Sequence, residues 1–235
     1  MEPHAIKYIF KFQNNQQEII DINLDPHTLE IIGERIEDLP LWTHLDVHQC
    51  SHCPLIVQIH SHCPAAVHLT RLSSLFESLV SFDEVQVNII THQRILYKET
   101  SAQKGVSSLM GLIMAISGCP HMAFMKPMAR FHLPFADAEE TVYRAVSMYL
   151  LAQYFRQKQG MSPDMELKGL KQIYENIQKV NEALAARLRT INDKDASTNA
   201  LVILDTFAQA VPFAIDNTLN EISPFFASYF AYPRV

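Results

Sequence analysis

The period of the hydrophobic pattern changes near residue 100, and this change limits the folds that the chain can adopt. Apolar and polar residues partly alternate from Ile6 to Phe12, and a second apolar segment, Ile19–Leu24, follows a polar stretch. A period of two is typical of strands with one buried face, so these segments predict a β-hairpin with a longer loop. A third short strand is expected over 28–32, and a further strand pattern over 85–97.

Apolar residues at helical spacing predict one helix among these strands and mainly helices after them. The first helix is expected over about 65–80, after an irregular loop over 40–54. The later helices are expected over 106–116, from there to about 128, over 137–157 and 167–188, and as two helices within 197–230 that are split near Pro212. The sequence thus predicts an α+β protein with a small N-terminal mixed β-sheet and one helix, followed by a mainly helical C-terminal half.

The domain organisation predicted for the chain is a single compact unit. No internal repeat and no long flexible linker interrupts residues 1–235. A subdivision into a sheet-containing part, 1–100, and a helical part, 101–235, is the alternative.

Charge and hydropathy exclude several classes of partner. The formal net charge is −6, and Lys and Arg are scattered, so we expect no binding to nucleic acid or to an anionic membrane. We find no apolar run of the roughly 18 residues that a membrane-spanning helix needs. The N-terminus lacks the basic and apolar regions of a signal peptide. We therefore expect a cytoplasmic protein that does not enter a membrane.

Four cysteines in a protein of this size and compartment do not predict a disulfide framework. Metal binding, catalysis and simple burial are the remaining interpretations. Cys50, Cys53 and Cys63 lie close together, and Cys119 stands apart. Six of the 11 histidines fall between His44 and His68. This clustering favours a metal-binding element in the segment from Thr43 to His68.

The spacing Cys50-x2-Cys53 can point two thiolates at one ion, and Cys63 adds a third. A tetrahedral zinc site needs one more ligand, for which we expect Cys119. The alternate ligands are histidines, namely His48, His62, His121 and His132. Thiolates with imidazole available suit zinc, or an iron–sulfur cluster, far better than magnesium or calcium. The alternative is that the cysteines are small buried hydrophobic residues and the histidines are solvated.

Three of the cysteines precede proline, at Cys53-Pro54, Cys63-Pro64 and Cys119-Pro120. A Cys at the N-cap followed by Pro is a reasonable start for a helix, and the helix dipole would lower the pKa of the thiol. This fits metal ligation and nucleophilic reactivity equally well. Cys-Pro pairs also occur in haem-binding segments and at cluster ligands.

Gly118 and Cys119 lie where one apolar helix is expected to end and another to begin. Cys119 is then the fourth metal ligand, a buried residue of the helix junction, or a nucleophile with His132 or His121 as its base. No P-loop, GxGxxG or GxSxG motif occurs, and no Glu-x-x-His lies on the long helices.

Several stretches together resemble a family of bacterial proteins described only as a domain of unknown function. They are Leu41–Thr43, Cys50–Leu55, His62–Ala66, Ser117–Pro120, Phe131–Phe135, Glu140-Thr141 and Tyr149–Tyr154. The resemblance covers about Pro40 to Leu204 and implies a bacterial origin. It carries no activity and no site residues, but it suggests that the two cysteine regions belong to one module.

The leading hypothesis is a metal-binding protein without enzymatic activity, in which Cys50, Cys53, Cys63 and Cys119 hold one structural zinc. The second is a redox or sensing protein with an iron–sulfur cluster, haem or reactive thiol at these cysteines. The third is a Cys/His-dependent enzyme. A protein partner or homo-oligomer is a fourth hypothesis, because C-terminal aromatic residues could form an exposed patch; they are Phe225, Phe226, Tyr229, Phe230 and Tyr232.

Overall fold

A computed structural model describes residues 2–33, 36, 38–72, 75, 79–191 and 196–231. The strands are β1 (His4–Lys11), β2 (Gln17–Leu24), β3 (Ile31–Ile32), β4 (Glu84–Thr91) and β5 (Ile95–Ser101). They form one sheet in the order β3-β2-β1-β4-β5, and each described pairing is antiparallel. The predicted α+β class and the predicted hairpin are confirmed, although the sheet is antiparallel where a mixed one was expected.

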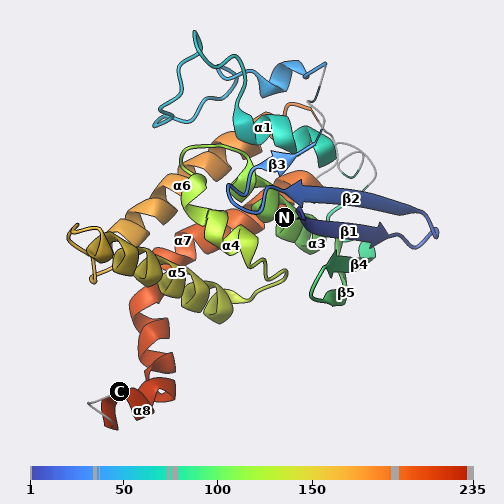
Figure 1. The fold of residues 1–235 in the computed structure, drawn as a ribbon. Helices are drawn as coiled ribbons and strands as arrows, with labels where there is room; N and C mark the ends of the chain where they lie inside the picture. Colours follow the sequence, from blue (N-terminus) through green and yellow to red (C-terminus); the bar gives the residue numbers. More distant parts are fainter. Residues whose placement is uncertain are drawn as a thin grey trace.

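Most of the helical elements follow the sheet along the chain, whereas α1 and short 3-10 helices lie between β3 and β4 (Figure 1). The α-helices are α1 (Pro64–Leu69), α3 (Ala102–Ile116), α4 (Lys126–Arg130), α5 (Ala138–Lys158), α6 (Lys168–Leu188), α7 (Ala196–Ile222) and α8 (Ala227–Ala231). The short 3-10 helices are η1 (Leu41–Thr43), η2 (Thr70–Leu72), η3 (Ala123–Met125) and η4 (Ser223–Phe226). The helix expected over 65–80 is observed as α1 and η2, and most of its second half lies outside the described residues.

One face of the sheet is buried because apolar side chains occupy alternate positions on the three central strands. These are Ile6, Tyr8 and Phe10 of β1, Ile20, Ile22 and Leu24 of β2, and Val85, Val87 and Ile89 of β4. Helix α3 packs on this face at Gly105, where a Cβ atom would lie 2.9 Å from Phe10 Cε1 and 3.1 Å from Val87 Cγ2. Glycine at this position therefore allows the helix to approach the sheet closely.

The predicted break at Pro212 is wrong, because α7 continues through this proline from Ala196 to Ile222. Proline removes one helix hydrogen bond at a cost of about 3 kcal/mol in an isolated helix. Tertiary packing offsets this cost, since Ala208, Val211 and Ile215 are buried around the proline. Beyond this region, the chain extends away from the rest of the structure to α8 (Figure 1).

The expectation that no apolar run could span a membrane also needs correction. Ser197–Ile215 within α7 is long and apolar enough by length and composition. The core helix of a folded domain passes the same test, and α7 packs on α3, α5 and α6. This stretch is therefore weak support for a membrane span.

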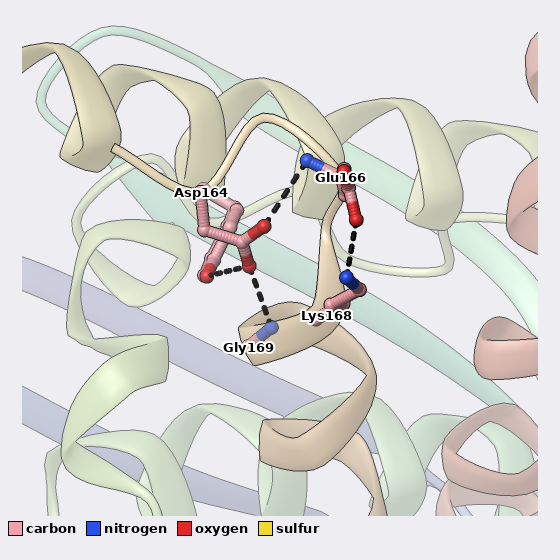
Figure 2. Close-up of polar contacts among 5 residues, drawn as sticks. Asp164, Glu166, Lys168 and Gly169 are labelled. Carbon is pink, nitrogen blue, oxygen red and sulfur yellow. Dashed lines mark hydrogen bonds and ion pairs between the residues drawn. The ribbon is translucent and has the colours of Figure 1, made fainter. Parts of the chain in front are cut away.

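The start of α6 is fixed by the side chain of Asp164 in the preceding loop (Figure 2). Its carboxylate accepts hydrogen bonds from the backbone N–H groups of Gly169 at 2.8 Å and Glu166 at 3.1 Å. The Tyr149 hydroxyl of α5 donates a third, at 2.8 Å. Lys168 and Glu166 form an ion pair beside this carboxylate. Asp164 thus ties the N-terminus of α6 to α5 and helps to orient the helix that reaches the cysteines at its other end.

Candidate functional site

The loop between β3 and α1 carries three of the four cysteines and is closed at its base by backbone pairing. The N–H of Cys63 donates to Thr43 O at 2.8 Å, and the N–H of Leu45 donates to Ser61 O at 2.9 Å. His44 and His62 form the antiparallel bridge between them, with ring centroids 4.6 Å apart. The two ends of the histidine-rich segment therefore lie side by side, above α1 in Figure 1.

Each cysteine lies at a turn or at the start of a helical segment. The N–H of Cys53 donates to Cys50 O at 3.0 Å, which closes a tight turn between them. Cys63 is the N-cap of α1 with Pro64 at the first helical position, as the Cys-Pro pattern predicted. Cys119 follows Gly118, which has a φ of +83°, and its carbonyl accepts from the next turn of the chain. Cys119 is buried, and the other three are half-buried.

The Cys119 segment lies against both parts of the cysteine loop, although 56 positions of sequence separate it from Cys63. A Cβ atom at Gly118 would lie 3.9 Å from the Pro64 Cβ, next to Cys63. The Nε2–H of His121 donates to the carbonyl of His52 at 2.9 Å, within the turn between Cys50 and Cys53. The rings of His121 and His52 also stack with centroids 3.9 Å apart. These contacts bring the helix junction and the loop to one place.

Electrostatic coupling among the thiols reflects this proximity. Burial raises the pKa of Cys50 to about 12, with nearby Cys63, Cys119 and Cys53 adding to the rise. Burial also raises the pKa of Cys119; Cys63 and Cys53 act in the same direction, and the N–H groups of Met122 and His121 oppose it. Each of these two thiols therefore lies near enough to the others for their negative charges to repel.

Arg187 of α6 supplies a positive charge beside this cluster. Its side chain is only 1% exposed, and it donates hydrogen bonds to the carbonyls of Trp42 at 2.7 Å, His44 at 2.5 Å and Leu45 at 3.0 Å. Burial lowers the pKa of Arg187, while the thiols of Cys63, Cys50 and Cys53 and the Asp46 carboxylate act to raise it. Within the described residues no carboxylate lies within ion-pair distance of this guanidinium.

Comparison with known protein families identifies the resemblance that the sequence suggested. The model of a domain of unknown function, DUF6901, matches residues 6–227. The chain belongs to this family. The match extends the similarity beyond both ends of the 40–204 range. Neither the curated proteins nor the solved structures compared with the chain give a match.

The alternate ligands of this DUF6901 member lie in different surroundings. His62 pairs with His44 and bonds Ser61 through Nδ1 at 2.8 Å, whereas His48 is exposed. His121 contacts the loop as described, and its hydrogen bond there uses Nε2. His132 lies with Tyr8 under the sheet, with Nε2 at 2.5 Å from the Tyr8 hydroxyl. The structure thus gives His132 and Cys119 no contact that would support a nucleophile–base pair among the described residues.

The positions of the potential metal ligands bear on the metal hypothesis. Across the described parts of the chain, no three His, Cys, Asp or Glu side chains are arranged so that they could hold a metal ion. The three segments that carry the four cysteines are in contact, but a shared ion would require the thiol side chains to turn toward one point. Ligation by Cys50, Cys53, Cys63 and Cys119 therefore stays a prediction.

Sequence reasoning missed Arg187, although the pattern of α6 contains a signal for it. Leu184 and Leu188 define the apolar stripe of this helix, and Arg187 lies three positions after Leu184 on the same face. A charge on the buried face of a helix needs a polar partner. Here the partners are the carbonyls of the cysteine loop, which join α6 to the site.

Proposed function

We propose that the chain is a metal-binding protein in which Cys50, Cys53, Cys63 and Cys119 hold one zinc ion with a structural role. The observation that carries the proposal is the meeting of the Cys119 helix junction with the Cys50–Cys53 turn and with the start of α1. Three separate parts of the chain that carry these cysteines thereby lie in contact with one another. Four soft thiolates form a donor set that suits zinc.

Arg187 supports this proposal through its charge. Four thiolates around a divalent ion leave a net negative charge in a partly buried place. A guanidinium that is held on three carbonyls of the same loop offsets this charge without itself occupying a ligand position. With no metal ion present, burial raises the pKa of Cys50 and of Cys119, so these two thiols would stay protonated.

A structural role is favoured over a catalytic one because four protein ligands would close the tetrahedron. A catalytic zinc keeps one position open for water. Closure would pin the irregular loop to the helix junction, so the free energy of metal binding would contribute to folding. The raised pKa values of Cys50 and Cys119 also argue against a reactive thiol, since the thiolate is the nucleophilic form.

The experiment is a metal analysis of protein purified without affinity metals and under anaerobic conditions. We expect about one zinc ion per chain and a colourless protein. If the protein instead contains iron and sulfide and absorbs visible light, the same cysteines hold an iron–sulfur cluster rather than zinc. Cobalt substitution should give the visible bands of a tetrahedral thiolate site in the folded wild-type protein, which tests ligation without any mutation.

Matched variants identify the ligands. Cys50→Ser and Cys119→Ser should each lower the metal content and shift the cobalt spectrum, because each removes one thiolate. Ser51→Ala, an exposed position in the same turn, is the control and should keep both. Wild-type protein without stoichiometric metal, or a melting temperature that chelator leaves unchanged, would overturn the structural zinc site.

A further inference from the structure

A second candidate site, which none of the four cysteines lines, is a cavity of about 390 Å³ between α3, α5, α6 and α7. The volume falls in the roughly 300–1,000 Å³ range of small-molecule sites. Most of its lining residues are apolar. Met122, Met125 and Met128 form one wall, and these flexible thioether side chains can adapt to an apolar ligand.

The charged residues that line this cavity are all cations. Lys98, Lys104 and Arg144 line it, and no Asp or Glu does so in the described part of the chain. The formal net charge of the whole chain is −6, so this lining has the opposite sign to the chain as a whole. Such a local excess of positive charge favours an anionic ligand.

Arg144 can bind such an anion because its hydrogen bonds to the protein use only part of its guanidinium. Nη2 donates to Phe131 O at 2.8 Å and to Met128 O at 3.2 Å, and these bonds hold the side chain against the cavity wall. A guanidinium has five N–H donors in a planar fork that matches a carboxylate. No carboxylate of the described residues lies within ion-pair distance of Arg144.

The remaining polar wall is neutral. The Tyr8 hydroxyl bonds both Ser108 Oγ, at 3.1 Å, and His132 Nε2, so Ser108 and His132 enter the cavity lining already partnered. Burial lowers the pKa of His132 to about 3, so its ring is uncharged near neutral pH. The cations are therefore Lys98, Lys104 and Arg144, and a ligand would place its anionic end beside them.

We propose that this cavity binds a small molecule with an apolar body and one carboxylate, such as a medium-chain fatty acid or an aryl-alkyl carboxylate. The carboxylate contacts Arg144, with Lys104 and Lys98 nearby, and the apolar body packs on the methionines. This proposal is independent of the zinc proposal, because none of the four cysteines lines the cavity.

The test is calorimetric titration of the full chain, as purified, with octanoate, phenylbutyrate, 1-octanol and octyltrimethylammonium. We expect at least one of the two carboxylates to bind more tightly than octanol, and the ammonium compound to bind least. Binding of octanol as tightly as both carboxylates, or no binding of either carboxylate, would overturn the proposal.

Variants locate the two ends of the ligand. Arg144→Gln should weaken carboxylate binding roughly tenfold or more and leave octanol within about twofold, since a charge-assisted hydrogen bond is lost. Should this variant fold poorly, the exposed Lys104→Gln should weaken the carboxylate in the same selective way. Ala136→Phe, at the half-buried cavity lining, should weaken both ligands, and exposed Lys179→Gln, outside the lining, should change neither. Unchanged carboxylate binding in both Arg144→Gln and Lys104→Gln would contradict the assigned site.

Discussion

The Nε2 atom of His121 lies 2.9 Å from the carbonyl oxygen of His52, and their rings stack. One histidine lies two positions after Cys119, and the other lies inside the Cys50–Cys53 turn. The imidazole pair therefore joins the two cysteine regions directly.

At the proposed zinc site, His121→Ala should weaken metal binding roughly tenfold, the lower end of the effect for groups that orient metal ligands. The cause is the loss of both the hydrogen bond to His52 and the ring stack, which leaves the Cys119 segment free to separate from the loop. Competition against a chromophoric chelator measures the affinity. His60→Ala, an exposed position in the same loop, is the control. Equal affinities in the wild-type protein and in His121→Ala would contradict this positioning role.

Arg187→Met should destabilise the fold by about 3 kcal/mol, because it leaves buried carbonyls of the cysteine loop without a donor. Arg187→Lys keeps the charge but cannot bond three carbonyls with a planar fork, so we expect an intermediate loss. Urea unfolding measures the loss of stability in both variants. Arg189→Met removes an exposed arginine two positions later and should change the free energy of unfolding little. A loss in Arg187→Met no larger than in Arg189→Met would show that the guanidinium does not fix the loop.

His132 should make the protein less stable as the pH falls. Burial lowers its pKa to about 3 from 6.5, with Arg144 and His4 acting in the same direction. The unfolded chain takes up a proton below about pH 6.5 while the folded chain does not, so stability is lost from there down toward pH 3. Between pH 7 and pH 5, the lowered pKa of His132 should reduce the free energy of unfolding by about 2 kcal/mol.

Urea unfolding of His132→Gln at both pH values isolates this contribution. The pKa values of His4, His52 and His68 are also lowered by burial, so they add to the wild-type dependence. The difference in free energy of unfolding between the wild type and His132→Gln should be smaller at pH 5 than at pH 7. The control is His92→Gln, at an exposed turn, which should keep the pH dependence of the wild type. A pH dependence in His132→Gln as steep as in the wild type would argue that His132 is protonated in the folded state.

The local elements of this fold could be predicted because their signals lie within a few residues. At the start of α5, the Asp137 carboxylate accepts from the N–H of Glu140 at 2.8 Å, and the Glu140 carboxylate accepts from the N–H of Asp137 at 3.0 Å. The sequence predicted a helix over 137–157, and α5 begins at Ala138 with Asp137 as its N-cap. Pro212 carried an equally clear local signal for a break, but burial of the neighbouring side chains outweighed it.

For the candidate cysteine site, the sequence could predict the residue types but not the contacts between distant segments. Cys-x2-Cys indicated a turn, and the structure has one there. Of the three Cys-Pro pairs, Cys63-Pro64 begins a helix, whereas Cys53-Pro54 and Cys119-Pro120 do not. The contact of Arg187 with the loop and the pairing of His52 with His121 depend on segments far apart in sequence, for which local periodicity carries no information. A family match without an activity adds no residue roles to this pattern.

Gly169→Ala should destabilise the protein by about 1–3 kcal/mol, because a Cβ atom there would collide with the Tyr149 hydroxyl. The same hydroxyl donates to Asp164, whose carboxylate also holds the N–H of Gly169 at the start of α6. Tyr149→Phe removes the hydroxyl and one hydrogen bond, at a cost of about 1 kcal/mol. The double variant should then lose less than the sum of the two single losses, because removing the hydroxyl removes the atom nearest to the new methyl group. Strict additivity in urea unfolding would show that crowding against Tyr149 is not what excludes a side chain at position 169.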